Sequence, residues 1–128
     1  MGYYSKVGLV LSKKAVMAFN DKITAHRREH PDDDVSLMLL NHQSCNSLDQ
    51  ETGDLLLCWD AVKWYENFPE VRFILDFLKT LDSDDYLFIR IGEDIDDYEM
   101  AGSRRGEPFF MRLERNIAVG AENNRVKL

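Results

Sequence analysis

The sequence has few cysteines and no long run of apolar residues. Only two of its 128 residues are cysteine, Cys45 and Cys58, and they lie in different segments of the chain. They make no metal-type pair, so we expect the reduced thiols of a cytoplasmic protein. No apolar run is long enough to span a bilayer, and Met1–Ser5 lacks the charged and apolar regions of a signal peptide. We therefore expect no membrane segment.

Motifs of nucleotide-dependent enzymes and of nucleic-acid-binding proteins are also missing. No glycine-rich sequence has a form that cradles phosphate groups. His42, Ser44 and Cys45 lie close together, but nothing around them is typical of a serine or cysteine nucleophile. Residues 54–65, an aromatic-rich segment, lack the basic, glycine-containing signature of an RNA-recognition motif. We therefore expect neither a nucleotide cofactor nor direct contact with nucleic acid.

The composition is that of a globular domain. Hydrophobic residues make up 45% of the chain and charged residues 30%, which distinguishes it from a disordered chain. The length is common for a single domain with one sizeable core, and the sequence has no repeats and no linker. We therefore expect residues 1–128 to form one domain.

Acidic residues are concentrated in one short segment. The net charge is −7 at pH 7. Between residues 82 and 99 eight acids stand against a single base, Arg90, while acids and bases balance in the rest of the chain. The eight acids are Asp82, Asp84, Asp85, Glu93, Asp94, Asp96, Asp97 and Glu99. A field of this sign repels phosphate groups and favours partners with a basic surface.

Periodicity in the first two thirds of the chain predicts alternating strands and helices. Apolar residues alternate over residues 3–12, which predicts a strand, and Ser12 is placed to cap a helix that follows it. Residues 35–43 and 54–65 predict the second and third strands, with a polar loop between them. Pro69 fits the first turn of a second, more apolar helix.

The remaining apolar segments predict further strands. Residues 86–91 predict a fourth strand, and residues 95–102 are expected to return as its hairpin partner. Residues 108–119 also alternate, and residues 120–128 are expected to form a tail or a docked arm. The predicted fold is therefore α+β, with a ferredoxin-like β-α-β-β-α-β core, both helices on one face of the sheet, and additional C-terminal strands. The alternative is an α+β sheet with another strand order.

The apolar faces of these elements predict which side chains form the core. The expected core residues are Phe19 on the first helix, Ile74 and Leu78 on the second, and Ile89 on the fourth strand.

One zinc motif occurs in the sequence. The residues from His26 to His30 read H-R-R-E-H, which matches H-x-x-E-H, a motif that needs both histidines on one face of a helix. Pro31 follows directly and disfavours the helical conformation at His30, so this geometry is expected to be lost. A polar helix end with basic side chains near the negative pole of the helix dipole accounts for the same residues.

The acidic segment fits no common metal-binding pattern. A calcium loop starting at Asp94 would need an acid or amide at its fifth position and glycine at its sixth. Tyr98 and Glu99 occupy these positions. Neighbouring carboxylates of one turn tend to diverge into water, so we expect no tight metal site.

Three stretches carry a resemblance to known proteins: MGYYSKVGLVLS at residues 1–12, WYENFPEVRFILDFL at residues 64–78 and YLFIRIGEDIDDYE at residues 86–99. In these stretches the chain resembles small proteins of unassigned function found in bacteriophages and prophages. The resemblance spans most of the chain and carries no residue roles. It implies a phage accessory protein in the bacterial host cytoplasm. Such proteins are often inhibitors of a host enzyme or defence complex, and several use acidic surfaces in place of DNA.

These features together predict a non-enzymatic interaction protein. It would bind and inhibit a bacterial host or defence protein with a basic surface, such as a nucleic-acid-handling complex, by nucleic-acid mimicry. The predicted contact residues are the eight acids together with Ile95 and Tyr98, with Asp32–Asp34 as a second acidic contact. Two alternatives are a metal-dependent hydrolase that uses acidic residues and His26, and a self-associating structural protein.

Overall fold

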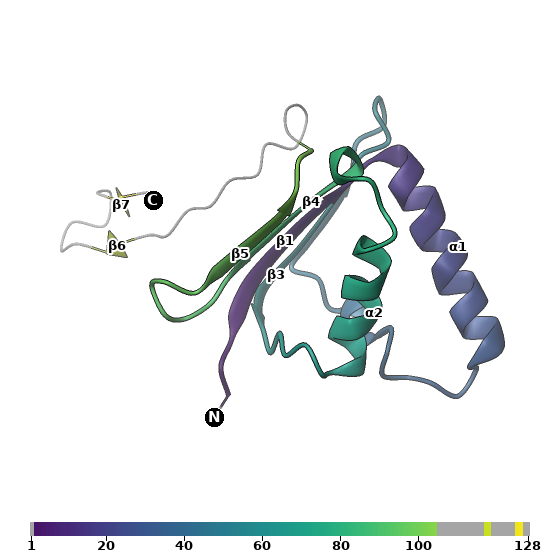
Figure 1. Cartoon of the computed structure of the whole chain (residues 1–128), viewed down its shortest axis with the longest axis horizontal. Helices are drawn as coiled ribbons and strands as arrows, with labels where there is room; N and C mark the ends of the chain where they lie inside the picture. The colour runs from purple at the N-terminus through teal and green to yellow at the C-terminus, as the bar shows by residue number, and fades with distance from the viewer. Residues whose placement is uncertain (1, 105–116, 119–124, 127–128) are drawn as a thin grey trace.

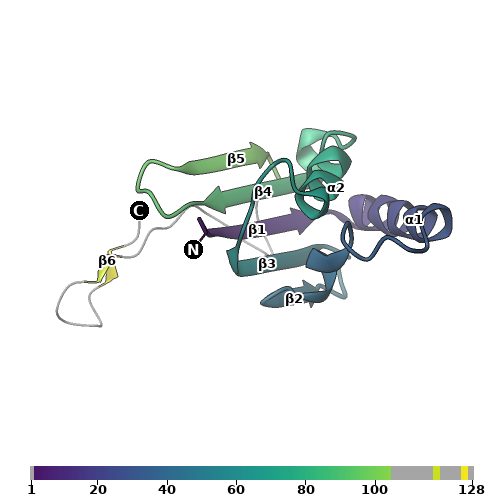
Figure 2. The ribbon, with the colours of Figure 1, turned by 90° about the horizontal axis from the view of Figure 1, so that it is seen from below.

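The computed structural model describes residues 2–104, 117–118 and 125–126. In this part of the chain a five-stranded antiparallel sheet forms one layer and two α-helices form a second (Figure 1). The strands are β1 (Ser5–Leu11), β2 (Cys45–Leu48), β3 (Leu55–Val62), β4 (Tyr86–Ile91) and β5 (Tyr98–Gly102). Their order in the sheet is β2-β3-β1-β4-β5, which places the first strand of the chain at the centre (Figure 2). The α+β class is confirmed.

The two helices begin where the sequence predicts. Helix α1 (Lys13–Glu29) starts after Ser12, whose Oγ accepts a hydrogen bond from the backbone N–H of Ala15 at 3.1 Å, as expected of an N-cap. Helix α2 (Pro69–Leu78) has its proline in the first turn, where the missing N–H has no intrahelical partner to lose. Both helices lie on the same face of the sheet (Figure 1).

The main core lies between the helices and the sheet. Phe19 of α1 packs on Phe77 of α2, with ring centroids 4.6 Å apart. The four predicted core residues, Phe19, Ile74, Leu78 and Ile89, are all buried. Ile89, however, belongs to a second apolar cluster with Val10 and Leu87. Since side chains of a strand alternate between faces, this cluster lies on the side of the sheet away from the helices.

The second strand differs from its prediction. Residues 35–43, predicted as a strand, form turns and a short 3₁₀ helix, η1 (Met38–Asn41). Leu37 and Leu39 are buried two residues apart, which imitates the period of a strand. The turn is fixed instead by Asp33, whose Oδ1 accepts hydrogen bonds from the backbone N–H groups of Val35 and Ser36. The true second strand, β2, lies in the segment that was expected to be a polar loop.

The predicted hairpin is confirmed. Strand β5 pairs with β4 in antiparallel register, with Arg90 opposite Glu99. The predicted strand over residues 108–119 and the expected tail over residues 120–128 lie outside the described residues, except for a short antiparallel pair. This pair consists of β6 (Ile117–Ala118) and β7 (Arg125–Val126).

Candidate interaction site

The acidic segment is divided between the two ends of strand β4. Asp82, Asp84 and Asp85 precede the strand, and the last two belong to a short 3₁₀ helix, η2 (Ser83–Asp85). The other five acids follow the strand, in the turn to β5 and in β5 itself. Six residues of extended chain separate the two groups, which corresponds to about 20 Å. The eight acids therefore form two separate groups and not one continuous surface.

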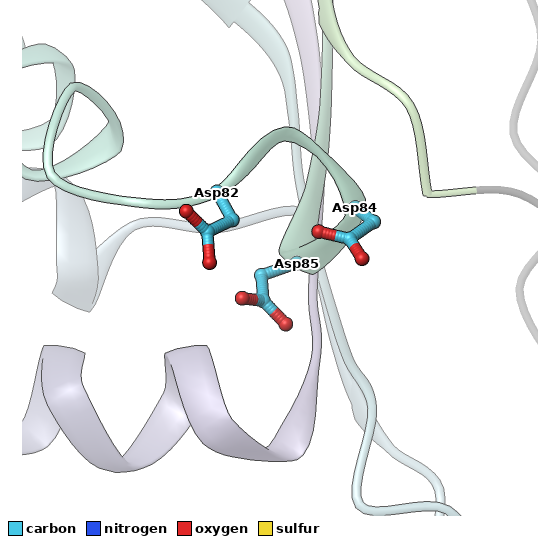
Figure 3. Close-up of side chains that lie close together, drawn as sticks. All are labelled: Asp82, Asp84 and Asp85. Carbon is cyan, nitrogen blue, oxygen red and sulfur yellow. The ribbon is translucent and has the colours of Figure 1, made fainter.

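The carboxylates of the first group converge. One oxygen from each of Asp82, Asp84 and Asp85 lies within 4.8 Å of the others (Figure 3). Asp85 also accepts a hydrogen bond from Ser12 Oγ at 3.0 Å. This contact brings a carboxylate to the N-terminus of helix α1, where the helix dipole favours negative charge.

This group is where a metal ion could be held. Within the described ranges it is the one place where three such ligand atoms meet. Carboxylate oxygens are the ligands that Ca²⁺ and Mg²⁺ prefer, although tight sites usually provide more of them. This group was not predicted from the sequence, where the acids after β4 were the candidate ligands, because its convergence depends on the turn at η2.

The two histidines of the H-x-x-E-H motif lie side by side, with ring centroids 4.9 Å apart, but among the described residues no third ligand completes a metal-binding group with them. Helix α1 ends at Glu29, and His30 has φ −134° and ψ 65°, which is not helical. His30 leaves the helical conformation as expected, but its backbone N–H still donates to the His26 backbone oxygen at 2.8 Å, so the expected loss of the i, i+4 spacing is wrong. His26 Nε2 lies 2.9 Å from Asp33 Oδ2. Hydrogen bonds from Ser36, and then from His26, hold the pKa of Asp33 below its usual range. Residues 32–34 were predicted to form a second acidic contact, and two of them, Asp32 and Asp34, are exposed.

The second group of acids is organised by Arg90, the lone base of the segment. Its side chain is only 12% exposed and donates to Asp97 Oδ1 at 2.6 Å, to Ser5 Oγ at 3.1 Å and to Glu99. The hydrogen bonds with Asp97, and then those with Glu99, raise the pKa of Arg90 further above its usual range. Arg90 thus joins β1, β4 and both sides of the hairpin.

The N-terminal residues brace the same hairpin. Tyr3 Oη donates to Asp97 Oδ2 at 2.6 Å and accepts from the backbone N–H of Asp94 at 2.9 Å. The backbone N–H of Tyr4 donates to the Glu93 carboxylate. At Gly92 a Cβ atom would collide with the Asp97 carboxylate and the Tyr3 hydroxyl. The packing of the brace therefore requires glycine at this position.

The braced hairpin presents an apolar side chain between two acids. Ile95 is 65% exposed, and Asp94 and Asp96 on either side of it are exposed as well. Tyr98 at the start of β5 is 52% exposed. We call residues 93–98 the hairpin tip.

A second arginine was missed by sequence reasoning. Arg104 follows β5, and its Nε and Nη2 donate to the two carboxylate oxygens of Asp54, both at 2.8 Å. Its Nη1 donates to the backbone oxygen of Asp84 at 3.2 Å. The Asp54 side chain is only 5% exposed, and the hydrogen bond to it raises the pKa of Arg104. The one sequence signal for this ion pair was Asp54, a charged residue directly before the apolar strand β3.

The fold and the site define an α+β protein with a braced acidic hairpin at one end of its central strands. No family model, curated protein or solved structure matches the chain. Among the described residues, no helix has both the length and the apolar character that crossing a bilayer requires.

Proposed function

We propose that the protein is a non-enzymatic interaction protein that binds a partner with a basic surface through the hairpin tip. The observation that carries this proposal is Ile95, an apolar side chain that is 65% exposed and is flanked in the sequence by the exposed acids Asp94 and Asp96. An isoleucine in this position adds little to the core. It offers instead an exposed apolar contact whose two sequence neighbours are exposed acids, and apolar side chains of this kind anchor protein interfaces.

The hydrogen bonds that hold the tip favour such a role. Arg90 and Tyr3 fix Asp97 and the backbone of Asp94 before any partner arrives. The turn is closed further by the backbone N–H of Gly92, which donates a hydrogen bond to the backbone oxygen of Asp97 at 2.8 Å. Ordering a loop on binding consumes free energy, so a tip that is already ordered binds more tightly than a flexible one with the same residues.

Binding would proceed in two physical steps. The carboxylates of Asp94 and Asp96 first attract a basic surface and raise the rate of association. Ile95 and Tyr98 then lose water against the partner and slow dissociation. The association rate should fall as salt rises, because the Debye length shrinks from about 10 Å at 0.1 M to about 3 Å at 1 M.

The more specific parts of the hypothesis stay predictions. They are the phage origin, the cytoplasm of a bacterial host, a host or defence protein as the target, inhibition of that target, and nucleic-acid mimicry. The metal-dependent hydrolase and the self-associating protein remain the alternatives.

We also propose that strands β2, β3, β1 and β4, with the two helices, represent a ferredoxin-like core to which β5 is added at one edge. The support is the position of β1 between β3 and β4, with β2 outside β3 and both helices on one face.

The test is a capture experiment with matched charge reversals. The full chain and an Asp94→Lys/Asp96→Lys variant are immobilised and exposed to bacterial lysate, and the captured proteins are identified by mass spectrometry. The control is Asp21→Lys/Glu51→Lys, which reverses two exposed acids elsewhere. Asp97 is left intact, because a lysine there would face Arg90 and remove part of the brace.

We expect a basic protein to be captured by the wild type and the control but lost with the hairpin variant and at high salt. With that protein purified, Ile95→Ala should weaken its binding by roughly thirtyfold, or about 2 kcal/mol. The free energy of unfolding of the hairpin variants should lie within about 0.5 kcal/mol of that of the wild type, since exposed side chains contribute little to stability. Equal capture by the wild type and the hairpin variant would refute the proposal, as would the absence of any captured basic protein.

A further inference from the structure

The two cysteines, distant in the sequence, are direct neighbours in the sheet. Cys45 on β2 and Cys58 on β3 are partners in the antiparallel register, and both thiols are free and half-buried. Side chains of such partners lie on the same face, with Cβ atoms about 4.5–5.5 Å apart. A disulfide needs a Cβ separation of about 3.5–4.5 Å, so a small local shift suffices. We propose that Cys45 and Cys58 form a dithiol site that small disulfides oxidise reversibly to an intramolecular disulfide.

The backbone around the pair suits this reaction. Ser44 donates to the backbone oxygen of Cys58 twice, from its N–H at 2.8 Å and from its Oγ at 3.1 Å. These bonds hold β2 in register beside β3. Strand β2 is also an edge strand that pairs with β3 alone. It can therefore move toward β3 by a fraction of an ångström without breaking a second row of hydrogen bonds.

An open cavity borders the site on the side of Cys58. Cys58 lines an open cavity of about 210 Å³, together with Gly8, Asp60, Ile89 and other residues. Gly8 is the register partner of both Cys58 and Ile89, and it has no side chain to fill the space between them. The cavity lies on the sheet face away from the helices, which is the face that carries the second apolar cluster.

The environments of the two thiols set the order of attack. Burial, followed by the charge and hydrogen bond of Cys45, raises the pKa of Cys58 to about 11. Because thiolate is the attacking species, Cys58 should react about tenfold more slowly than an ordinary thiol, even after allowance for its greater intrinsic nucleophilicity. Cys45, on the outer strand, is therefore the first attacking group.

The chemistry is thiol–disulfide exchange with glutathione disulfide. The Cys45 thiolate attacks one sulfur of glutathione disulfide, the S–S bond breaks, and one glutathione thiolate leaves. The Cys58 thiolate then attacks Cys45 Sγ in the mixed disulfide and releases the second glutathione. Two protein thiols are oxidised to one disulfide, one glutathione disulfide is reduced to two thiols, and the two protons pass from the protein thiols to the glutathione thiolates.

The test uses the full chain in native buffer with defined mixtures of reduced and oxidised glutathione. Samples are quenched by alkylation and analysed by intact mass and peptide mapping. We expect both cysteines to lose alkylation together, with a peptide linking Cys45 to Cys58, and the reaction to reverse when reduced glutathione is added. The denaturant midpoint of the oxidised protein should rise, because the link restricts the unfolded chain.

Single variants supply the controls. Cys58→Ser should stop at a glutathione adduct on Cys45, and Cys45→Ser should form its adduct on Cys58 more slowly than that, because Cys58 stays buried. Neither variant should gain a higher midpoint on oxidation. The proposal is overturned if both thiols remain alkylatable in pure glutathione disulfide, or if the oxidised wild type contains only mixed disulfides or cross-linked dimers.

Discussion

The two ends of strand β4 carry acids of the same type, and the chain uses them differently. Before the strand, Asp82, Asp84 and Asp85 lie within reach of one another, and Ser12 is the hydrogen-bonding side chain at Asp85. After the strand, bonds from Arg90, Tyr3 and the backbone of Tyr4 engage three of the five acids. The other two, Asp94 and Asp96, are the exposed sequence neighbours of Ile95. A count of acids is therefore a poor measure of the charge that a surface can offer to a partner.

The two ends also differ in the burial of the carboxylates with which their arginines pair. Arg104, near the first group, pairs with a carboxylate that is only 5% exposed, whereas Arg90 pairs with carboxylates that are a third to a half exposed. Losing a partner is much more damaging for a buried charge than for one that water can solvate.

The largest effect is expected at Arg104. Arg104→Ala should reduce the free energy of unfolding by about 3 kcal/mol, because it leaves the Asp54 carboxylate buried and unpaired. Denaturant unfolding measures this loss. Arg104→Ala combined with Asp54→Asn should recover much of it, since the buried charge is then gone. A loss below about 1 kcal/mol in the single variant would contradict this account of Asp54.

A smaller loss of stability is expected at Arg90. Arg90→Ala should reduce the free energy of unfolding by about 2 kcal/mol, because it removes the ion pairs with Asp97 and Glu99, and the loss stays smaller than at Arg104 because water can then hydrate both carboxylates. Its main effect should be local, with amide hydrogen exchange of residues 93–98 at least tenfold faster, or about 1.4 kcal/mol less protection. Arg104→Ala serves as the control, because it should leave exchange at the hairpin tip unchanged. Unaltered exchange at the tip of Arg90→Ala would show that Tyr3 alone is a sufficient brace.

The smallest effect concerns cations. In a titration with Ca²⁺ followed by NMR, shift changes should be confined to residues 82–85, with a dissociation constant on the order of 1 mM. The reason is that three converging carboxylates attract a cation but leave most of its coordination to water. Asp84→Asn should weaken this binding, and Asp96→Asn should not. Shift changes centred on the hairpin tip would reverse the comparison between the two ends.

The elements that could be predicted from sequence are those fixed by local rules. Ser12 caps α1, Pro69 opens α2, and the apolar run at residues 86–91 forms β4 because each depends on neighbouring residues alone. Strand β2 was missed because an edge strand exposes most of its side chains and needs no apolar pattern. The adjacent residues 35–43 were wrongly predicted to form a strand. Their leucines have the spacing of a strand, but the turn that Asp33 fixes overrides it.

The candidate site was predictable only in outline. The position of the acids and the exposure of Ile95 and Tyr98 agree with the sequence pattern. The brace could not be predicted from the sequence. Arg90 and Ser5, which are hydrogen-bonded, are 85 residues apart in the chain, and Tyr3 and Asp97 are 94 residues apart. The neighbouring position of Cys45 and Cys58 likewise depends on the register of β2, which the sequence pattern did not reveal. Contacts of this range are set by strand order and not by local composition.

The central place of β1 has a consequence for how the chain folds. Strand β1 is synthesised well before its two partners, since Val7 pairs with Trp59 on one side and with Arg90 on the other. Until β4 has been made, one edge of β1 has no hydrogen-bonding partner, and the apolar side chains of β1 are incompletely buried. Pairings so distant in sequence raise the contact order and slow folding. The emerging chain therefore leaves its most buried strand incompletely paired until β4 has been made, and this strand is open to non-native contacts during that time.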